Sequence, residues 1–216
     1  MNCDGIARWY RTGEYVVFGR SLEKTRLHFL SEMMAARNVL ILGDGDGRFT
    51  AEFVRSNPQA RVESLDLSAR MIDLAKGRVD GIGGAVTFRV GDARNIALNG
   101  PYDLVVSHFF LDCFTDAEVM PLIKRVAQHC EAGARWVVSE FCLPEQGLIR
   151  IAGWLLIRFL YLCFRVTTGL KVRRLSDYSL ALSRHGFRIA QRHTSLGGLL
   201  VSEIWNGTSI PRAEQP

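Results

Sequence analysis

Short apolar runs alternate with segments of helical spacing through the middle of this chain, and this alternation constrains its fold more than any other feature. The apolar runs are strand-like and cover 38–42, 61–65, 86–90, 102–107 and 134–141. The helical segments between them cover 49–56, 68–79 and 115–130. Strands that alternate with helices at this spacing predict an α/β fold, in which a mostly parallel sheet carries helices on both faces.

The order of elements changes after the fifth strand. A long helical stretch over 146–168 is followed by a second helix over 177–185, with no strand between them. Strands over 187–194 and 199–205 come next, and they are joined by a link that contains Gly-Gly, which is typical of a hairpin. The sheet is therefore predicted to end in an antiparallel pair, with an extra lid helix between its fifth and sixth strands.

The helix over 115–130 has its own start and stop signals. Thr115 and Glu118 have the spacing of a capping box, which predicts that the helix begins there. Gly133 is expected to end it, because glycine adopts the left-handed conformation that closes many helices.

The most specific motif is Gly43-Asp44-Gly45-Asp46-Gly47-Arg48, directly after the first strand. Glycines at such a turn let the backbone approach a ligand at the N-terminus of the next helix. A dinucleotide fingerprint requires a third glycine at the sixth position, where this loop has Arg48. Two aspartates in the loop would also repel a pyrophosphate. The loop therefore favours a cationic or zwitterionic ligand, and a nicotinamide oxidoreductase stands as a rival that failure to bind NAD(H) would remove.

Two further acidic residues are expected at the ends of the next strands. Asp66 ends the second strand, where a carboxylate can accept hydrogen bonds from both hydroxyls of a ribose. Asp92 follows the third strand within Gly91-Asp92-Ala93. Open α/β sheets bind ligands at the carboxyl ends of their strands, so these groups and the glycine loop are predicted to share one site.

Four stretches together resemble the class I S-adenosylmethionine-dependent methyltransferases, and in particular their small-molecule branch, which includes the quinone-type enzymes. The stretches are 39–47, 65–71, 91–93 and 102–108, in the family's order on the predicted elements. The resemblance implies a Rossmann-like sheet of seven strands, mostly parallel, with an antiparallel last strand. It also implies S-adenosylmethionine as the cofactor and methyl donor, with S-adenosylhomocysteine as the product.

The resemblance implies roles for the glycine loop. Gly43, Gly45 and Gly47 would pass the backbone around the methionine part of the cofactor. The family often has an acidic residue two positions before the first glycine, where this chain has Ile41. A loop aspartate, either Asp44 or the one two residues further on, is expected to balance the sulfonium or amino charge instead.

The residues after the second and third strands would hold the nucleoside part of the cofactor. By the same resemblance, Asp66 would bind the ribose hydroxyls, and Leu67 and Met71 would pack against the adenine. Asp92 would accept a hydrogen bond from the adenine amino group, and Ala93 would supply backbone contacts.

The end of the fourth strand would face both cofactor and substrate. By the same resemblance, Ser107, His108 and Phe109 would line this part of the site. Tyr10 and Tyr15, in the leading segment, are expected either to close over the cofactor or to pack on the core. His108 is the candidate general base, because imidazole titrates near neutral pH. The competing interpretation is a histidine that only shapes the pocket. No metal site is predicted, because the five cysteines have no C-x-x-C spacing.

The sequence favours a small apolar or aromatic methyl acceptor. Nucleic-acid enzymes that methylate exocyclic amines resemble one another in an Asn/Asp-Pro-Pro-Tyr motif, whereas 107–110 here reads Ser-His-Phe-Phe. No nucleic-acid partner is therefore expected. The net charge is +5, and residues 147–216 alone hold ten Lys/Arg against three Asp/Glu, which leaves RNA methylation as an alternative.

The inserted helix bears on the choice of partner. At about 100° per residue, Arg150, Arg158 and Arg165 share one stripe beside a wide apolar surface. Such a helix can roof an apolar pocket, contact an anionic membrane through 147–174, or bury itself in the core or in a dimer contact. Neither a signal peptide nor a transmembrane helix is predicted, so we expect a cytoplasmic protein, with peripheral membrane contact left open.

One domain is predicted, because the length is near that of a single domain and no linker-like tract divides the chain. Residues 5–36 would form a helical lid segment with a break near Gly19. The cofactor-binding core would cover 37–145, the inserted amphipathic helix 146–174, and the last helix and hairpin 175–207. The leading hypothesis is a methyltransferase that acts on a small molecule. The alternative is a non-catalytic protein that binds S-adenosylmethionine or a membrane surface and retains the fold.

Overall fold

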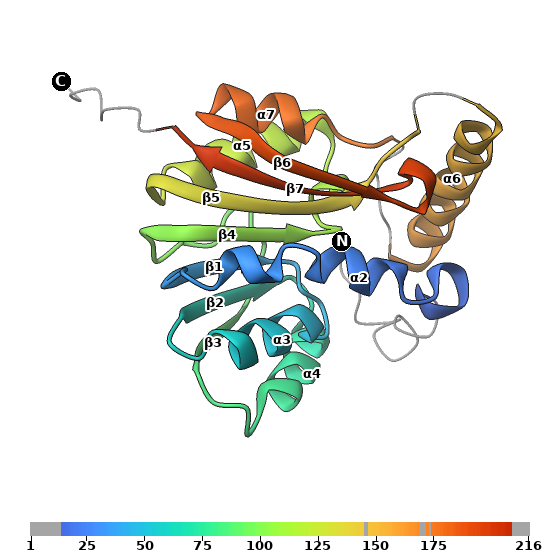
Figure 1. Ribbon diagram of the computed structural model, residues 1–216. Coiled ribbons are helices and arrows are strands. Elements are labelled where there is room, and N and C mark those ends of the chain that lie inside the picture. Colours follow the sequence, from blue (N-terminus) through green and yellow to red (C-terminus); the bar gives the residue numbers. More distant parts are fainter. Residues whose placement is uncertain (1–13, 145–146, 169–171, 173, 209–216) are drawn as a thin grey trace.

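A seven-stranded sheet in the order β3-β2-β1-β4-β5-β7-β6 forms the centre of the molecule (Figure 1). The computed structural model describes residues 14–144, 147–168, 172 and 174–208. The strands are β1 Asn38–Leu42, β2 Arg61–Asp66, β3 Ala85–Val90, β4 Tyr102–His108, β5 Cys130–Phe141, β6 Phe187–Ser195 and β7 Leu200–Gly207. β7 runs antiparallel to both of its neighbours, and the remaining pairs are parallel. The predicted α/β fold with an antiparallel last strand is confirmed.

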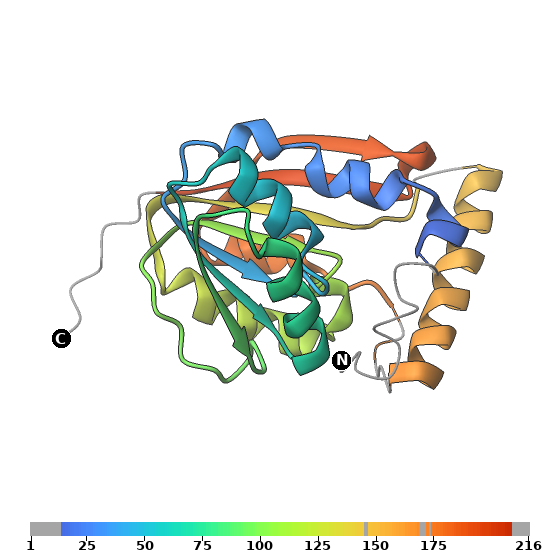
Figure 2. The ribbon, with the colours of Figure 1, turned by 90° about the horizontal axis from the view of Figure 1, so that it is seen from below.

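Helices cover both faces of this sheet. They are α2 Ser21–Leu27, α3 Arg48–Ser56, α4 Ala69–Val79, α5 Asp116–Ala127, α6 Leu148–Thr168 and α7 Tyr178–Arg184, with short 3-10 turns η1 Leu30–Met33, η2 Leu111–Cys113 and η3 Leu196–Gly198. α3 and η1 pack in one apolar cluster with one face of the sheet. α5 and α7 pack in a second cluster with the other face. α6 stands across the end of the sheet at which β4 and β5 terminate (Figures 1 and 2).

The apolar run of β1 is continuous because this strand is buried on both sides. Val39 and Ile41 belong to the cluster under α3, whereas Leu40 and Leu42 belong to the cluster under α5. Side chains alternate between the faces of a strand, and a parallel sheet with helices on both faces leaves neither side to solvent. All four side chains are at most 1% exposed.

Two local signals from the sequence have different outcomes. The capping box at the start of α5 is present, with Glu118 Oε2 accepting from the Thr115 amide at 3.0 Å. However, the helix ends at Ala127 and not near Gly133, so the predicted stop signal is wrong. Gly133 has φ +77° and lies inside β5, where the pairing register with β4 shifts. Between the pairs Tyr102–Cys130 and Leu104–Arg135, β5 has three residues more than β4, and glycine adopts a left-handed conformation in this irregular stretch without steric cost.

The leading segment breaks where it was expected to. The chain is helical over 14–18, and Gly19 then adopts φ +56° before α2 begins. The break lets Phe18 and Leu22 both reach an apolar cluster with Leu200 of β7.

Candidate functional site

A cleft that is open to solvent lies at the carboxyl ends of β1, β2, β3 and β4. Most of the predicted site residues line it, namely Gly43, Asp44, Gly45, Asp66, Leu67, Met71, Asp92, Ala93, His108 and Phe109. Its other lining residues are Arg26, Arg48, Leu65, Gly91, Arg94, Phe110, Cys113 and Phe114. The topology thus brings together residues from elements that are far apart in the chain.

Two of the predicted site residues in the described part of the chain do not line this cleft. Gly47 packs against α4, where an added Cβ would lie 2.6 Å from the Ala75 Cα. Ser107 is fully buried and accepts a hydrogen bond from the Trp136 indole at 2.9 Å. Tyr10 lies outside the described residues. Gly47 and Ser107 therefore pack beneath the lining residues and do not face the cleft.

The glycine loop leaves its backbone open toward the cleft at two positions. Gly43 has φ +68° and Gly45 has φ +62°, conformations that residues with a Cβ rarely adopt. The Phe110 ring lies so close over Gly43 that an added Cβ would clash with it. Glycine is thus required here both by the turn and by the close approach of an aromatic ring.

The two loop aspartates have different tasks. Asp44 accepts hydrogen bonds from the Thr50 amide at 2.9 Å and the Thr50 hydroxyl at 2.6 Å, and so stabilises the start of α3. Burial raises the pKa of Asp44 to about 6. Asp46 pairs instead with Arg48 at 2.9 Å and with Arg78 of α4 at 2.8 Å. Asp44 is therefore the acidic group that the loop presents to the cleft.

Asp66 is held in place by backbone amides at the end of β2. Its Oδ2 accepts from the Gly45 amide at 3.1 Å, and its Oδ1 accepts from the Ser68 amide at 2.8 Å. Burial raises the pKa of this carboxyl, although these two hydrogen bonds oppose the shift. Each carboxylate oxygen has a second lone pair, so Asp66 can still accept two hydroxyl groups.

Asp92 is paired with a side chain that sequence reasoning missed. The Arg94 guanidinium contacts both carboxylate oxygens of Asp92, at 2.6–3.1 Å. It also reaches Glu118 at 2.5 Å and lies 5.8 Å from the centre of the Phe114 ring. The bonds from Arg94 lower the pKa of Asp92. Beside this pair, Leu67 is 37% exposed and Met71 is buried, which leaves an apolar wall in the same part of the cleft.

His108 is a buried, neutral histidine at the end of β4. Neither ring nitrogen has a hydrogen-bond partner among the described residues, and the Phe49 ring packs edge-on at 4.6 Å. Burial, followed by the nearby Arg26 charge, lowers its pKa to about 3. Such a histidine can exchange hydrogen bonds with a ligand, but it is a weak base near neutral pH.

Arg26 reaches the cleft from α2, and the sequence held no signal for it. Its guanidinium donates to Glu14 at 2.5 Å and lies 5.1 Å from the centre of the Phe109 ring. Glu14 also pairs with Arg48, which lines the cleft as well. The two arginines share the Glu14 carboxylate, and Arg48 also pairs with Asp46, so two carboxylates balance their charges.

A buried carboxyl group shapes the wall of the cleft after β4. Glu140 accepts from the amides of Phe110 at 3.0 Å and Leu111 at 2.7 Å. These bonds hold a sharp turn in which Phe109 has φ +53°, an uncommon conformation for a residue with a large side chain. Burial and the neighbouring Asp112 raise the pKa of Glu140 well above its usual value.

Asp112 and Cys113, in η2, complete this wall. Burial raises the pKa of Asp112 to about 6, and the charge of Asp112 in turn raises the pKa of Glu140. The pKa of Cys113 is also raised well above its usual value, by burial and then by the Asp112 charge. This thiol therefore remains protonated near neutral pH.

The sheet order is that of the Rossmann-like methyltransferase fold. Residues 39–133 of the chain match the family described as a methyltransferase domain. This match spans β1 to the first part of β5, the segment that contributes most of the cleft.

Two curated relatives match at the level of sequence. The release factor glutamine methyltransferase of Bordetella pertussis is 33% identical over 158 residues, which are 68% of this chain and 54% of that protein. The malonyl-[acyl-carrier protein] O-methyltransferase of Bacillus cytotoxicus is 31% identical over 123 residues, 52% of this chain and 42% of that protein. The chain thus spans about half the length of the curated relatives it matches, and these two act on different acceptors.

The fold is also that of a solved methyltransferase. The magnesium protoporphyrin IX methyltransferase from Synechocystis PCC 6803, crystallised with bound SAH, superposes with a TM-score of 0.66. The match covers 93% of this chain and 88% of that one at 17% identity.

Proposed function

We propose that this protein transfers a methyl group from S-adenosylmethionine to a small apolar or aromatic molecule. The observation that carries the proposal is one cleft that combines Asp66 at the end of β2, the exposed backbone of the glycine loop and an aromatic wall.

The residues of the cleft fit S-adenosylmethionine in both shape and charge. Asp66, already fixed by two amides, would accept the ribose hydroxyls. Leu67 and Met71 would pack against the adenine, and Asp92 would accept a hydrogen bond from the adenine amino group. The pair that Asp92 forms with Arg94 must share or release one carboxylate oxygen for this contact.

The methionine part of the cofactor would lie against Gly43 and Gly45. Asp44 is the acidic group that would face its sulfonium or amino charge. The guanidinium groups of Arg26 and Arg48, which also line the cleft, would donate hydrogen bonds to its carboxylate. The opposite charges of the cleft are thus arranged for a zwitterionic ligand.

When bound, S-adenosylmethionine supplies an electrophilic methyl group for in-line displacement by the acceptor's nucleophilic atom. The protein contributes alignment and exclusion of water, which are the main requirements of such a transfer. We assign His108 a positioning role at the end of β4 in place of the predicted general base, since its lowered pKa leaves it a poor proton acceptor. The acceptor would therefore supply a nucleophile that needs no strong base.

The aromatic wall is what favours an apolar or aromatic acceptor. Phe109, Phe110 and Phe114 line the cleft beside Cys113. The ring of Phe109 packs against Phe141 at 5.2 Å between ring centres. Flat rings of this kind bind apolar and aromatic surfaces well and offer little to an anionic acceptor.

The test is calorimetric titration of the purified protein with S-adenosylmethionine, S-adenosylhomocysteine and NADH. We expect micromolar binding of the two sulfur nucleosides and none of NADH. A second step follows transfer of a labelled methyl group to a panel of phenols, quinols and apolar amines. Binding without turnover on the whole panel would support the non-catalytic alternative, and failure of both nucleosides to bind would contradict the proposed cofactor.

A further inference from the structure

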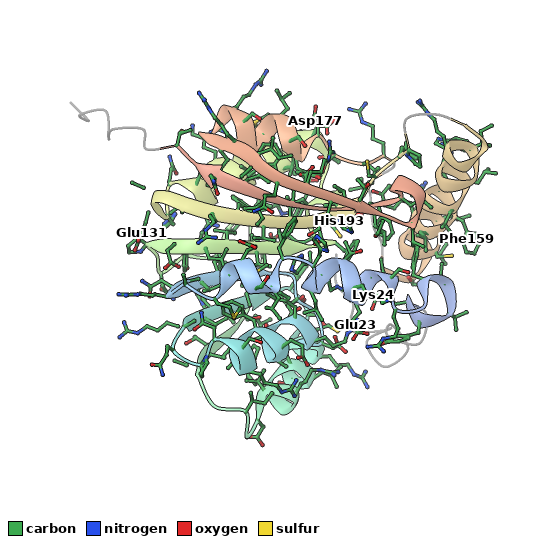
Figure 3. All side chains as sticks on the ribbon, in the orientation of Figure 1. Glu23, Lys24, Glu131, Phe159, Asp177 and His193 are labelled. Atoms are coloured by element: carbon green, nitrogen blue, oxygen red, sulfur yellow. The ribbon has the colours of Figure 1, made fainter. Side chains whose placement is uncertain are left out.

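The outer face of α6 exposes an unusual amount of apolar surface. Six large apolar side chains on this helix are 46–79% exposed, namely Ile151, Trp154, Leu155, Phe159, Leu162 and Val166. Phe159 lies on the side of α6 that faces away from the sheet (Figure 3). Contiguous exposed apolar surface of this kind marks an interaction site in most proteins.

Contacts on the inner face fix which side of α6 points outward. Ile157 and Tyr161 are buried in a cluster with Val172. Gly153 lies so close to Leu199 that an added Cβ would clash with its side chain. The exposed apolar stripe is therefore left over after the helix has already packed on the body of the protein.

The same outer face carries positive charge and no negative charge. Arg158 and Arg165 are exposed, and they lie about 20° apart around the helix axis at about 100° per residue. The helix contains no Asp, Glu or Lys. The Arg158 guanidinium lies 4.9 Å from the centre of the Trp154 ring, so its charge packs against an aromatic face. An apolar stripe edged by arginines is complementary to an anionic lipid surface.

We propose that the outer face of α6 docks on an anionic lipid bilayer, with the apolar stripe in the interface and the arginines on lipid phosphates. No helix in the described part of the chain is long and apolar enough to cross a membrane, so α6 would lie in the plane of the surface. Tryptophan and arginine are both favoured at that level of a bilayer. A second copy of the chain fits less well, because this face has no acidic residue to pair with the arginines.

The test is sedimentation of the full-length protein with vesicles of phosphatidylcholine alone or with about one third of phosphatidylglycerol. We expect binding to the anionic vesicles that weakens with added salt. The double variant Arg158→Gln/Arg165→Gln should lower the partition coefficient by about 25-fold, at about fivefold for each arginine. Phe159→Ser/Leu162→Ser should lower it as well, because it removes the apolar contact.

Matched controls replace exposed residues of the same kinds elsewhere. Arg61→Gln/Arg188→Gln and Leu74→Ser change exposed positions on β2, β6 and α4, and they should leave vesicle binding unchanged. Circular dichroism and binding of S-adenosylhomocysteine report whether each variant is folded. Since vesicle binding is measured without any acceptor, the outcome is independent of the proposed methyl transfer.

Three results would overturn the proposal. The first is equal binding of the wild type to neutral and anionic vesicles, or no binding to either. The second is a double arginine variant that binds as tightly as the wild type. The third is a dimer in sedimentation velocity that Phe159→Ser/Leu162→Ser dissociates, which would assign the face to a second copy.

Discussion

Asp66 illustrates how a single residue becomes a binding group through its surroundings. Its carboxylate is fixed by the amides of Gly45 and Ser68, so it is oriented before any ligand arrives. Pre-orientation of this kind reduces the entropy that binding would otherwise cost.

Replacement of Asp66 by alanine should weaken S-adenosylmethionine binding by about 1.5–3 kcal/mol, because two charge-assisted hydrogen bonds to the ribose are lost. Calorimetry measures the effect, and Asp66→Asn, which keeps one acceptor oxygen, should lose less. Unchanged affinity in the alanine variant would mean that the ribose lies elsewhere.

His108 should make stability depend on pH. Its pKa is lowered to about 3 in the folded protein, against 6.5 for a free side chain. The unfolded chain therefore binds a proton first, and the stabilising contribution, complete above about pH 6.5, is lost as the pH falls toward about 3. Between these two pH values, the free energy of unfolding should fall by about 1.4 kcal/mol per pH unit for one proton.

Urea unfolding at about pH 7, 6 and 5 checks this dependence. Carboxyl groups titrate in the same pH range. The informative quantity is therefore the difference in the free energy of unfolding between the wild type and His108→Asn at each pH. The variant should lose less stability on acidification. Parallel curves for the two proteins would contradict the burial of a neutral His108.

At the scale of elements, the turn after β4 depends on a residue of β5. Glu140 holds the amides of Phe110 and Leu111, and through them the aromatic wall of the cleft. Glu140→Ala leaves two amides without an acceptor and should destabilise the protein by about 2–5 kcal/mol. Glu140→Gln keeps an acceptor oxygen and resembles the protonated carboxyl, so it should cost less. Equal losses in the two variants, measured by urea unfolding, would contradict this role.

The junction between the glycine loop and α4 offers a second test at this scale. Gly47→Ala forces a Cβ against Ala75 at a φ of +78° and should destabilise the protein by about 2–4 kcal/mol. Gly77→Ala, inside α4 with open space around it, should instead stabilise by about 0.5–1 kcal/mol. In thermal unfolding, Gly47→Ala should lower the Tm and Gly77→Ala should raise it. Changes in Tm of the same sign in both variants would contradict the described packing.

At the scale of the whole molecule, ligand binding should stabilise the entire fold. The cleft takes residues from α2, the ends of β1, β2 and β4, and η2, so a bound nucleoside links elements on both sides of the sheet. S-adenosylhomocysteine at about 100 times its Kd should add about 2.7 kcal/mol, which corresponds to a rise in Tm of about 5–10 °C. Thermal unfolding measures the rise. NADH should produce none, and equal shifts with both ligands would argue against a specific nucleoside site.

The sequence by itself determined the order and type of the elements, the glycine turn after β1 and the place of Asp66 at a strand end. These features follow from local spacing, because side-chain periodicity and glycine conformations are encoded within a few residues. Only the tertiary structure decided that Arg26 and Arg94 line the cleft and that Glu140 holds the turn beside it.

The same holds for the properties of residues that the sequence did identify. The lowered pKa of His108 and the different partners of the two loop aspartates depend on what packs around them. The end of α5 was misjudged because Gly133 serves a register shift between β4 and β5, which is a contact between strands. Burial, pairing and charge are produced by segments that meet across the fold, and spacing along the chain does not record them.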